Sequence, residues 1–195
     1  MTPHTILWLS VIDWAAAWDG QQALALRLAS DGHAVTFVET PGVRSMARRD
    51  WTRLIRRLRN RVRGGVQGFR QLARNLWLLS PVLLPFPGRL WADRLNERLL
   101  MLSLRHLPTC GPGAPLMVWT YLPTPLAVQV VQALRPARLI YYCVNDIVQN
   151  PSGVAPGTVL AEQWLVRRAS HVFATSKELY TERKGLNPDI TYLPA

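Results

Sequence analysis

Five short, uninterrupted apolar runs recur along this chain, and they limit its possible fold more than any other feature. They are rich in β-branched and aromatic residues and span Ile6–Leu9, Val35–Val38, Leu116–Trp119, Leu139–Tyr142 and Val172–Ala174. Such runs are typical of strands buried on both faces, as in parallel sheets. Segments of helical character separate them, at Gln21–Ser30, Arg89–Arg105, Leu126–Leu134 and Thr158–Arg168. The alternation predicts an α/β fold with a doubly wound, mainly parallel sheet and helices on both of its faces.

The first β–α–β unit is the clearest. A helix from about Asp19 to Ser30 carries an apolar stripe, and Gly32 after it suits the left-handed position that ends a helix. Asp31-Gly32 between apolar runs also fits a hairpin. The length of the preceding segment and its many Ala and Leu residues favour the helix.

A chain of 195 residues predicts one domain, and residues 1–195 are interpreted as one Rossmann-like domain with a basic, less regular insertion at about 41–88. Ile190–Leu193 is predicted to be a strand, and only Pro194-Ala195 follow it. A doubly wound domain normally covers its last strand with a further helix. We therefore expect the sequence to be cut, with a carboxyl-terminal domain absent from it.

Positive charge is concentrated in the segment from Pro41 to Asn75, where eleven arginines and one acid, Asp50, give +10 of the chain's net +11. Trp51–Val62 within it resembles a basic amphipathic helix, which suits an anionic membrane, a nucleic acid or a solvated face. Its apolar stripe beside the arginines favours lipid headgroups over a duplex groove. The predicted membrane-contact residues are Trp51, Arg53, Arg56, Arg57, Leu58 and Arg59. No apolar run approaches the ~20 residues of a membrane-spanning helix, so we expect a cytoplasmic protein, peripheral at the inner face of the membrane.

No cofactor or metal is expected. The chain has no G-x-G-x-x-G fingerprint, no H-E-x-x-H and no Ser/His/Asp order, and its four histidines are scattered. Cys110 and Cys143 stand in no metal or redox spacing and are expected to be free thiols.

In open α/β sheets, ligands bind beyond the carboxyl ends of the strands, so the loop from Ser10 to Gln22 is the first candidate site. Its two aspartates and two tryptophans suit a sugar, because apolar ring faces stack on indoles and carboxylates accept hydroxyl protons. Asp13 is a candidate catalytic base, and Trp14, Gln21 and Gln22 are candidate substrate-binding residues. Trp14 and Trp18 could equally pack the loop, and the favoured role of Asp19 is to cap the helix.

Three further loops follow predicted strands. Thr120 and Tyr121 either face the cleft or serve structure, and Pro123 or Pro125 suits a helix start. Asp146 is either a catalytic base or a cap. Ser176 is explained as a helix cap, although an anion at the same helix terminus is an alternative and it is kept as a substrate-binding candidate. Glu39, which ends the second predicted strand, is interpreted as a solvated strand end rather than a ribose ligand.

These motifs together resemble the amino-terminal half of bacterial glycosyltransferases of the two-Rossmann-domain (GT-B) type, most closely those of teichuronic-acid biosynthesis. The similar segments occur in the expected order and are Ile6–Ser10, Asp13-Trp14, Gln21–Ala29, Gly32–Glu39, Val118–Pro123, Tyr141–Asp146, Ala174–Ser176 and Tyr192–Pro194. The chain departs from the pattern where Ala195 follows Pro194, since relatives continue "L-P-N-G", and at Asp19-Gly20, where relatives often carry a basic residue.

The resemblance implies transfer of a sugar from a nucleotide sugar to a cell-envelope polysaccharide or a lipid-linked acceptor. It implies that this half holds the acceptor, that a missing second domain binds the nucleotide sugar, and that the chain alone is inactive. The alternative is a non-catalytic Rossmann-like binding module that docks on an anionic membrane or on RNA.

Overall fold

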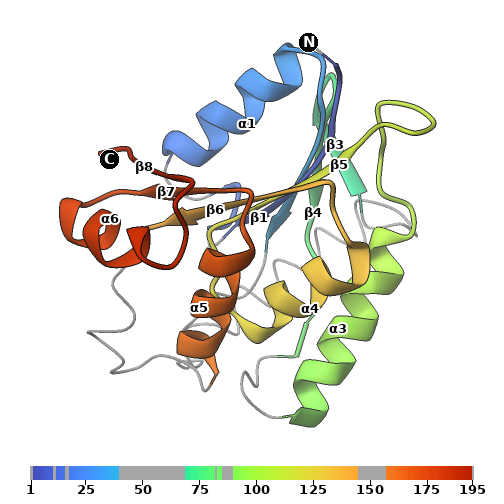
Figure 1. Ribbon diagram of the computed structural model, residues 1–195. Coiled ribbons are helices and arrows are strands. Elements are labelled where there is room, and N and C mark those ends of the chain that lie inside the picture. The colour runs from blue at the N-terminus through green and yellow to red at the C-terminus, as the bar shows by residue number, and fades with distance from the viewer. Residues whose placement is uncertain are drawn as a thin grey trace.

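The structure is a computed structural model that describes residues 2–10, 12–15, 18–39, 69–81, 83–84, 90–144 and 157–194. Its strands are β1 (Thr5–Ser10), β2 (Ala34–Glu39), β3 (Phe69–Ala73), β4 (Leu76–Leu79), β5 (Leu116–Thr120), β6 (Arg138–Cys143), β7 (His171–Ala174) and β8 (Ile190–Tyr192). They form one sheet in the order β3-β4-β2-β1-β5-β6-β7-β8 (Figure 1). All neighbouring pairs are parallel except β3 and β4. The prediction of one mainly parallel, doubly wound sheet that includes all five apolar runs is confirmed.

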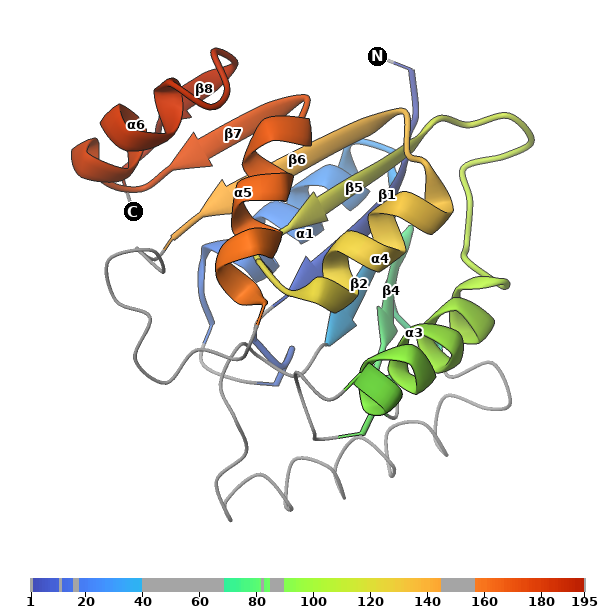
Figure 2. The ribbon, with the colours of Figure 1, turned by 60° about the horizontal axis from the view of Figure 1, so that its bottom comes forward.

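The described helices are α1 (Gly20–Ser30), α3 (Leu90–Leu104), α4 (Pro125–Leu134), α5 (Thr158–Arg168) and α6 (Lys177–Lys184). Helix α1 covers one face of the sheet, while α3, α4 and α5 cover the other (Figures 1 and 2). Helix α6 joins the second group, because Leu179 and Tyr180 pack into the same core as α5. The crossovers from β5 to β8 therefore all lie on one side of the sheet.

Strand β1 shows how the sequence builds two cores at once. Its side chains alternate between the faces and all six residues are buried. Leu7 and Leu9 enter the largely aliphatic core beneath α3, α4 and α5, whereas Ile6 and Trp8 enter the core beneath α1. A strand buried on both faces needs apolar residues at every position, which explains its continuous apolar run.

Side-chain caps set where three helices begin. Asp19 Oδ1 accepts a hydrogen bond from Gln21 N at 2.7 Å, and Gln22 Oε1 accepts one from Asp19 N at 2.9 Å, which together form a capping box. Thr124 caps α4, with Pro125 as its first residue, and Ser176 caps α6. The sequence-based assignments of Asp19 and Ser176 as caps, and of Pro125 as a helix start, are confirmed.

The insertion at 41–88 contains more regular structure than the sequence indicates. Within it, β3 and β4 form an antiparallel hairpin, and Asn75 takes a left-handed φ of 61° at the turn. Strand β4 pairs with β2 and so extends the parallel sheet. The sequence did not predict β3, because this strand lies at the sheet edge, exposes polar residues such as Arg70 and Gln71, and so lacks a continuous apolar run.

The chain turns out of α1 at Gly32, which takes a φ of +93° as the sequence predicts. Replacing Gly32 with Ala places a side chain in this backbone region, where an L-residue costs about 1–2 kcal/mol. We therefore expect Gly32→Ala to lower the free energy of unfolding by that amount in urea titrations followed by circular dichroism. Gly20→Ala is the control, since open space surrounds Gly20 and its φ is ordinary; it should not destabilise the protein. Equal stability of the two variants would contradict the strain argument.

Candidate functional site

The strand order reverses at β1: the strands that follow it in sequence are added first on one side of it and later on the other. From β1 the chain moves to β2 on one side, and β5 occupies the other side of β1. Loops that follow the two adjacent strands diverge at such a point and leave a crevice that commonly binds ligands. Here the flanking loops follow Ser10 and Thr120.

The loop after β1 is held onto α1 by polar contacts of two glutamines. Ser10 Oγ donates to Gln21 Oε1 at 3.0 Å and accepts from Ile12 N at 3.0 Å. Gln22 Nε2 donates to Trp14 O at 3.5 Å, and both glutamines are buried. The two predicted substrate-binding glutamines thus lie at the loop, where their contacts with the protein position it.

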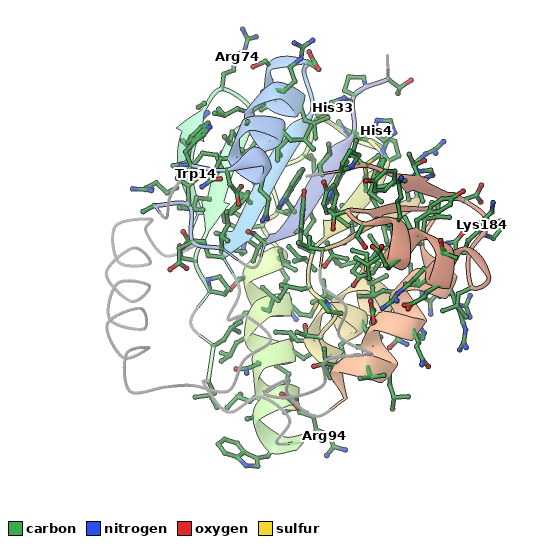
Figure 3. The ribbon with its side chains drawn as sticks, turned by 90° about the vertical axis from the view of Figure 1, so that its left-hand side faces the viewer. His4, Trp14, His33, Arg74, Arg94 and Lys184 are labelled. Atoms are coloured by element: carbon green, nitrogen blue, oxygen red, sulfur yellow. The ribbon has the colours of Figure 1, made fainter. Side chains whose placement is uncertain are left out.

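Asp13 and Trp14 lie at the outer part of this loop, and both are half-buried. The Trp14 ring meets Phe37 edge-on at 5.0 Å between centroids and Trp18 at 6.2 Å. Trp18 remains 63% exposed, so its indole is the more accessible of the two for stacking. Figure 3 shows Trp14 on the loop beside the blue strands and helix of the first unit. The structure thus brings two indoles together on this loop, which Asp13 also belongs to.

Glu39 is not the solvated strand end that the sequence indicates; that interpretation is wrong. Its side chain is only 2% exposed. Glu39 Oε1 accepts a hydrogen bond from Trp14 N at 2.8 Å, and Oε2 accepts a very short one from Ser80 Oγ. Because β2 lies between β1 and β4, its last residue faces the loops after both neighbours. The residue that could have indicated this burial is Ser80, the hydrogen-bond donor to Glu39. Its place beside Glu39 can be inferred only once Leu76–Leu79 is known to be a strand next to β2.

Thr120 ends β5 and Tyr121 follows it, on the other side of the point where the sheet reverses, and both are buried. The Thr120 hydroxyl accepts from Leu122 N at 3.0 Å, which stabilises the turn. Tyr121 N donates to Leu9 O at 3.2 Å, and its ring stacks between Trp8 and Tyr142, with centroid distances of 5.6 and 4.6 Å. Burial, together with nearby Tyr142, raises the pKa of Tyr121 well above its ordinary value. At neutral pH its hydroxyl is therefore protonated and able to donate a hydrogen bond.

The remaining predicted site residues are not placed by the structure at the ends of β1 and β5. Ser176 follows β7, two strands beyond β5, and its hydroxyl accepts from Leu179 N at 3.2 Å. Asp146 and the membrane-contact residues Trp51, Arg53, Arg56, Arg57, Leu58 and Arg59 lie outside the described residues. Within the part of the chain that the structure describes, no group of three or more His, Cys, Asp or Glu is placed to hold a metal ion.

A second polar cluster lies behind β6, where Glu162 and Arg183 form a buried ion pair at 3.2 Å. Cys143 Sγ donates to Glu162 Oε1 at 3.4 Å, and Arg183 also pairs with Glu182. Glu162, Glu182 and Arg183 border a pocket of about 150 Å³ between α5 and α6. Since Arg183 pairs with Glu162 on α5 and with Glu182 on its own helix, the cluster joins α6 to α5.

Comparison with known proteins identifies a fold and no family. No family model and no curated protein matches the sequence. Among solved structures, the chain is similar to a sucrose-phosphate synthase from Thermosynechococcus elongatus, with a TM-score of 0.62 and 14% sequence identity. The match covers 98% of this chain and 48% of the synthase, so the chain spans about half the length of that protein. At this identity the likeness establishes the Rossmann-like α/β fold alone.

Glu39 is expected to hold the loop after β1 in place. Glu39→Ala leaves the Trp14 amide and the Ser80 hydroxyl without their acceptor, and each buried orphan donor costs about 1–3 kcal/mol. We expect the free energy of unfolding to fall by about 2 kcal/mol or more. Glu39→Gln keeps one carbonyl oxygen and should lose less. Urea unfolding followed by tryptophan fluorescence measures both variants, and an Ala variant as stable as the wild type would exclude this role.

The two cysteines should differ in reactivity. Both are free, but Cys110 is exposed and Cys143 is buried. Burial, with the neighbouring Glu162 carboxylate, raises the pKa of the Cys143 thiol to about 12. Because the thiolate is the nucleophile, Cys143 should stay unmodified by iodoacetamide at pH 8 until the protein unfolds, while Cys110 reacts in the folded state. Mass spectrometry of tryptic peptides distinguishes the two, and early modification of Cys143 would contradict its burial.

Proposed function

We propose that this chain is the acceptor-side half of a glycosyltransferase that transfers a sugar from a nucleotide sugar to a cell-envelope polysaccharide or lipid-linked acceptor. The observation that carries the proposal is the pair of neighbouring indoles, Trp14 and Trp18, on the loop after β1 at the point where the sheet reverses; Asp13 directly precedes Trp14 in this loop. The likeness to half of a sucrose-phosphate synthase supports it, since that enzyme also handles sugar and phosphate.

In the proposed reaction, an acceptor hydroxyl attacks the anomeric carbon, the bond from that carbon to the donor phosphate breaks, and the nucleoside diphosphate leaves. If the configuration inverts, Asp13 or Asp146 takes the hydroxyl proton. If it is retained, the donor phosphate takes the proton and the aspartates position the acceptor. Trp14 and Trp18 stack on a sugar ring, and Tyr121 donates a hydrogen bond.

The alternative of a closed, non-catalytic module is less well supported, because one face of the sheet carries part-exposed aromatic rings. Trp119, Phe173 and Tyr142 form a row on the α1 face, with centroid distances of 5.8 Å from Phe173 to Trp119 and 6.0 Å from Phe173 to Tyr142. Among the described helices, α1 alone lies on this face, and it packs on β2 and β4 (Figure 1). An open apolar face suits one half of a larger enzyme.

Peripheral membrane attachment through Trp51–Val62 completes the proposal, with the acceptor on a lipid carrier. None of the helices in the described segments is long and apolar enough to cross a membrane. Contact would therefore be made at the membrane surface, where arginines near an anionic leaflet add about 1 kcal/mol each.

The proposal predicts that activity requires a donor-binding domain and Asp13. We expect the chain, when joined to a donor-binding domain, to transfer sugar from a UDP- or GDP-sugar to a lipid-linked acceptor. Asp13→Asn should then lower kcat by about 10²–10⁴-fold if Asp13 is the base. The control, Asp31→Asn, changes an exposed carboxylate at the opposite edge of the sheet and should leave kcat unchanged.

The chain alone provides the complementary measurement. Calorimetric titration with UDP- and GDP-sugars should show no binding tighter than about 1 mM, or roughly −4 kcal/mol. Micromolar binding would show that the donor site lies within this chain, and no transfer by the joined protein with any lipid-linked acceptor would refute the proposed function.

A further inference from the structure

We propose that the outward face of α3 is a membrane-contact surface for anionic lipid headgroups, separate from the Trp51–Val62 segment. Six exposed residues define this surface, here called the α3 stripe: Trp91, Arg94, Leu95, Arg98 and Leu102 on the helix, and Arg105 directly after it. Nothing in this inference depends on Asp13 or on glycosyl transfer, so it stands or fails apart from the proposed function.

The stripe follows from the helical repeat. Each member lies three or four residues from another member, and such positions share one side of a helix. The opposite side, with Ala92, Asn96 and Leu100, is buried against the body of the protein. Figure 3 shows Arg94 at one end of α3, pointing away from the sheet. At 1.5 Å per residue, the 15-residue helix gives a straight stripe about 22 Å long.

The apolar members of the stripe are large and accessible. Trp91 is 54% exposed, Leu95 41% and Leu102 53%. A single exposed leucine needs no explanation, but several aligned on one helix mark an interaction surface. Trp is favoured at membrane–water interfaces because its ring is amphipathic.

Arginine flanks these apolar residues at every turn. Arg94, Arg98 and Arg105 are exposed, and the nearest acids, Asp93 and Glu97, lie half-buried on the sides of the helix. The exposed stripe therefore carries +3 with no acid among its members. Arginine side chains lay their apolar stems along a surface and extend the charge to water or headgroups. The apolar residues of the stripe match the acyl region of a bilayer, and its arginines match anionic headgroups.

Two other occupants fit less well. A nucleic acid would pair with the arginines but would leave Leu95 and Leu102 exposed to phosphate and water. The chain's own Trp51–Val62 segment has the wrong charge, because it carries five arginines and no acid. Charge complementarity thus selects an anionic lipid surface.

Co-sedimentation of the whole chain with vesicles tests the arginines. We compare equimolar phosphatidylcholine–phosphatidylglycerol vesicles with pure phosphatidylcholine at low salt. Arg94→Gln, Arg98→Gln and Arg105→Gln combined should weaken binding to the anionic vesicles by about 100-fold, from roughly fivefold per arginine. The matched control combines Arg138→Gln, Arg167→Gln and Arg168→Gln, three exposed arginines elsewhere, and should change binding by a few-fold at most. Equal losses in both variants would show dependence on net charge only and would overturn the proposal.

A second comparison separates the stripe from the basic segment. With Arg53, Arg56, Arg57 and Arg59 changed to Gln and the stripe intact, binding to anionic vesicles should persist. It should be lost when the stripe variant is added. Loss of all binding in the first variant, or tight RNA binding by a chain that ignores anionic vesicles, would contradict the proposal.

An environment-sensitive fluorophore reports insertion directly. In a Cys110→Ser background, a fluorophore attached to the cysteine of the Leu102→Cys variant should shift its emission to shorter wavelength when anionic vesicles are added. Leu160→Cys is the control, since Leu160 is 72% exposed on α5, away from the stripe, and its dye should not shift. Circular dichroism verifies that each variant is folded. A shift at Leu160 and none at Leu102 would place the membrane on another face.

Discussion

Parallel pairing on both sides of β1 is the constraint on which this structure depends. Parallel strands cannot be joined by a tight turn, so each neighbour obliges the chain to leave the sheet and return through a crossover. Here β2 and β5 both pair with β1 in parallel register. That arrangement buries β1 on both faces, separates the two hydrophobic cores and creates the point at which successive loops diverge. The position of the candidate site is therefore set by the strand order of the sheet and not by any single side chain.

Side chains then determine how rigid that site is. Ser10, Gln21 and Gln22 hold the loop after β1 to α1, and Glu39 holds the same loop to the end of β2. These polar groups are buried, and their hydrogen bonds are formed within the protein. On the same loop, Asp13 is half-buried and Trp18 is 63% exposed. A positioned loop with accessible tips is the form in which binding residues are usually presented.

The parts of the fold that follow from local patterns could be predicted from the sequence. Continuous apolar runs identified β1, β2, β5, β6 and β7, and cap residues such as Asp19 and Ser176 identified helix starts. The hairpin of β3 and β4 could not be recognised, because an edge strand with Arg70 and Gln71 exposed lacks a continuous apolar run. The role of Glu39 was missed for a related reason, since its partners Trp14 and Ser80 are brought to it by sheet order and not by sequence proximity.

The position of β1 also has a consequence for the order in which the protein is assembled. During synthesis β2 emerges soon after β1, but Leu116, the partner of Thr5 on the other edge, emerges much later. Until then, the newly made chain carries an unpaired strand edge that other chains can pair with. Closing so long a loop is entropically costly and slow. We expect the nascent chain to need protection from aggregation during this interval, and the loops after β1 and β5 to come together only when the sheet is completed.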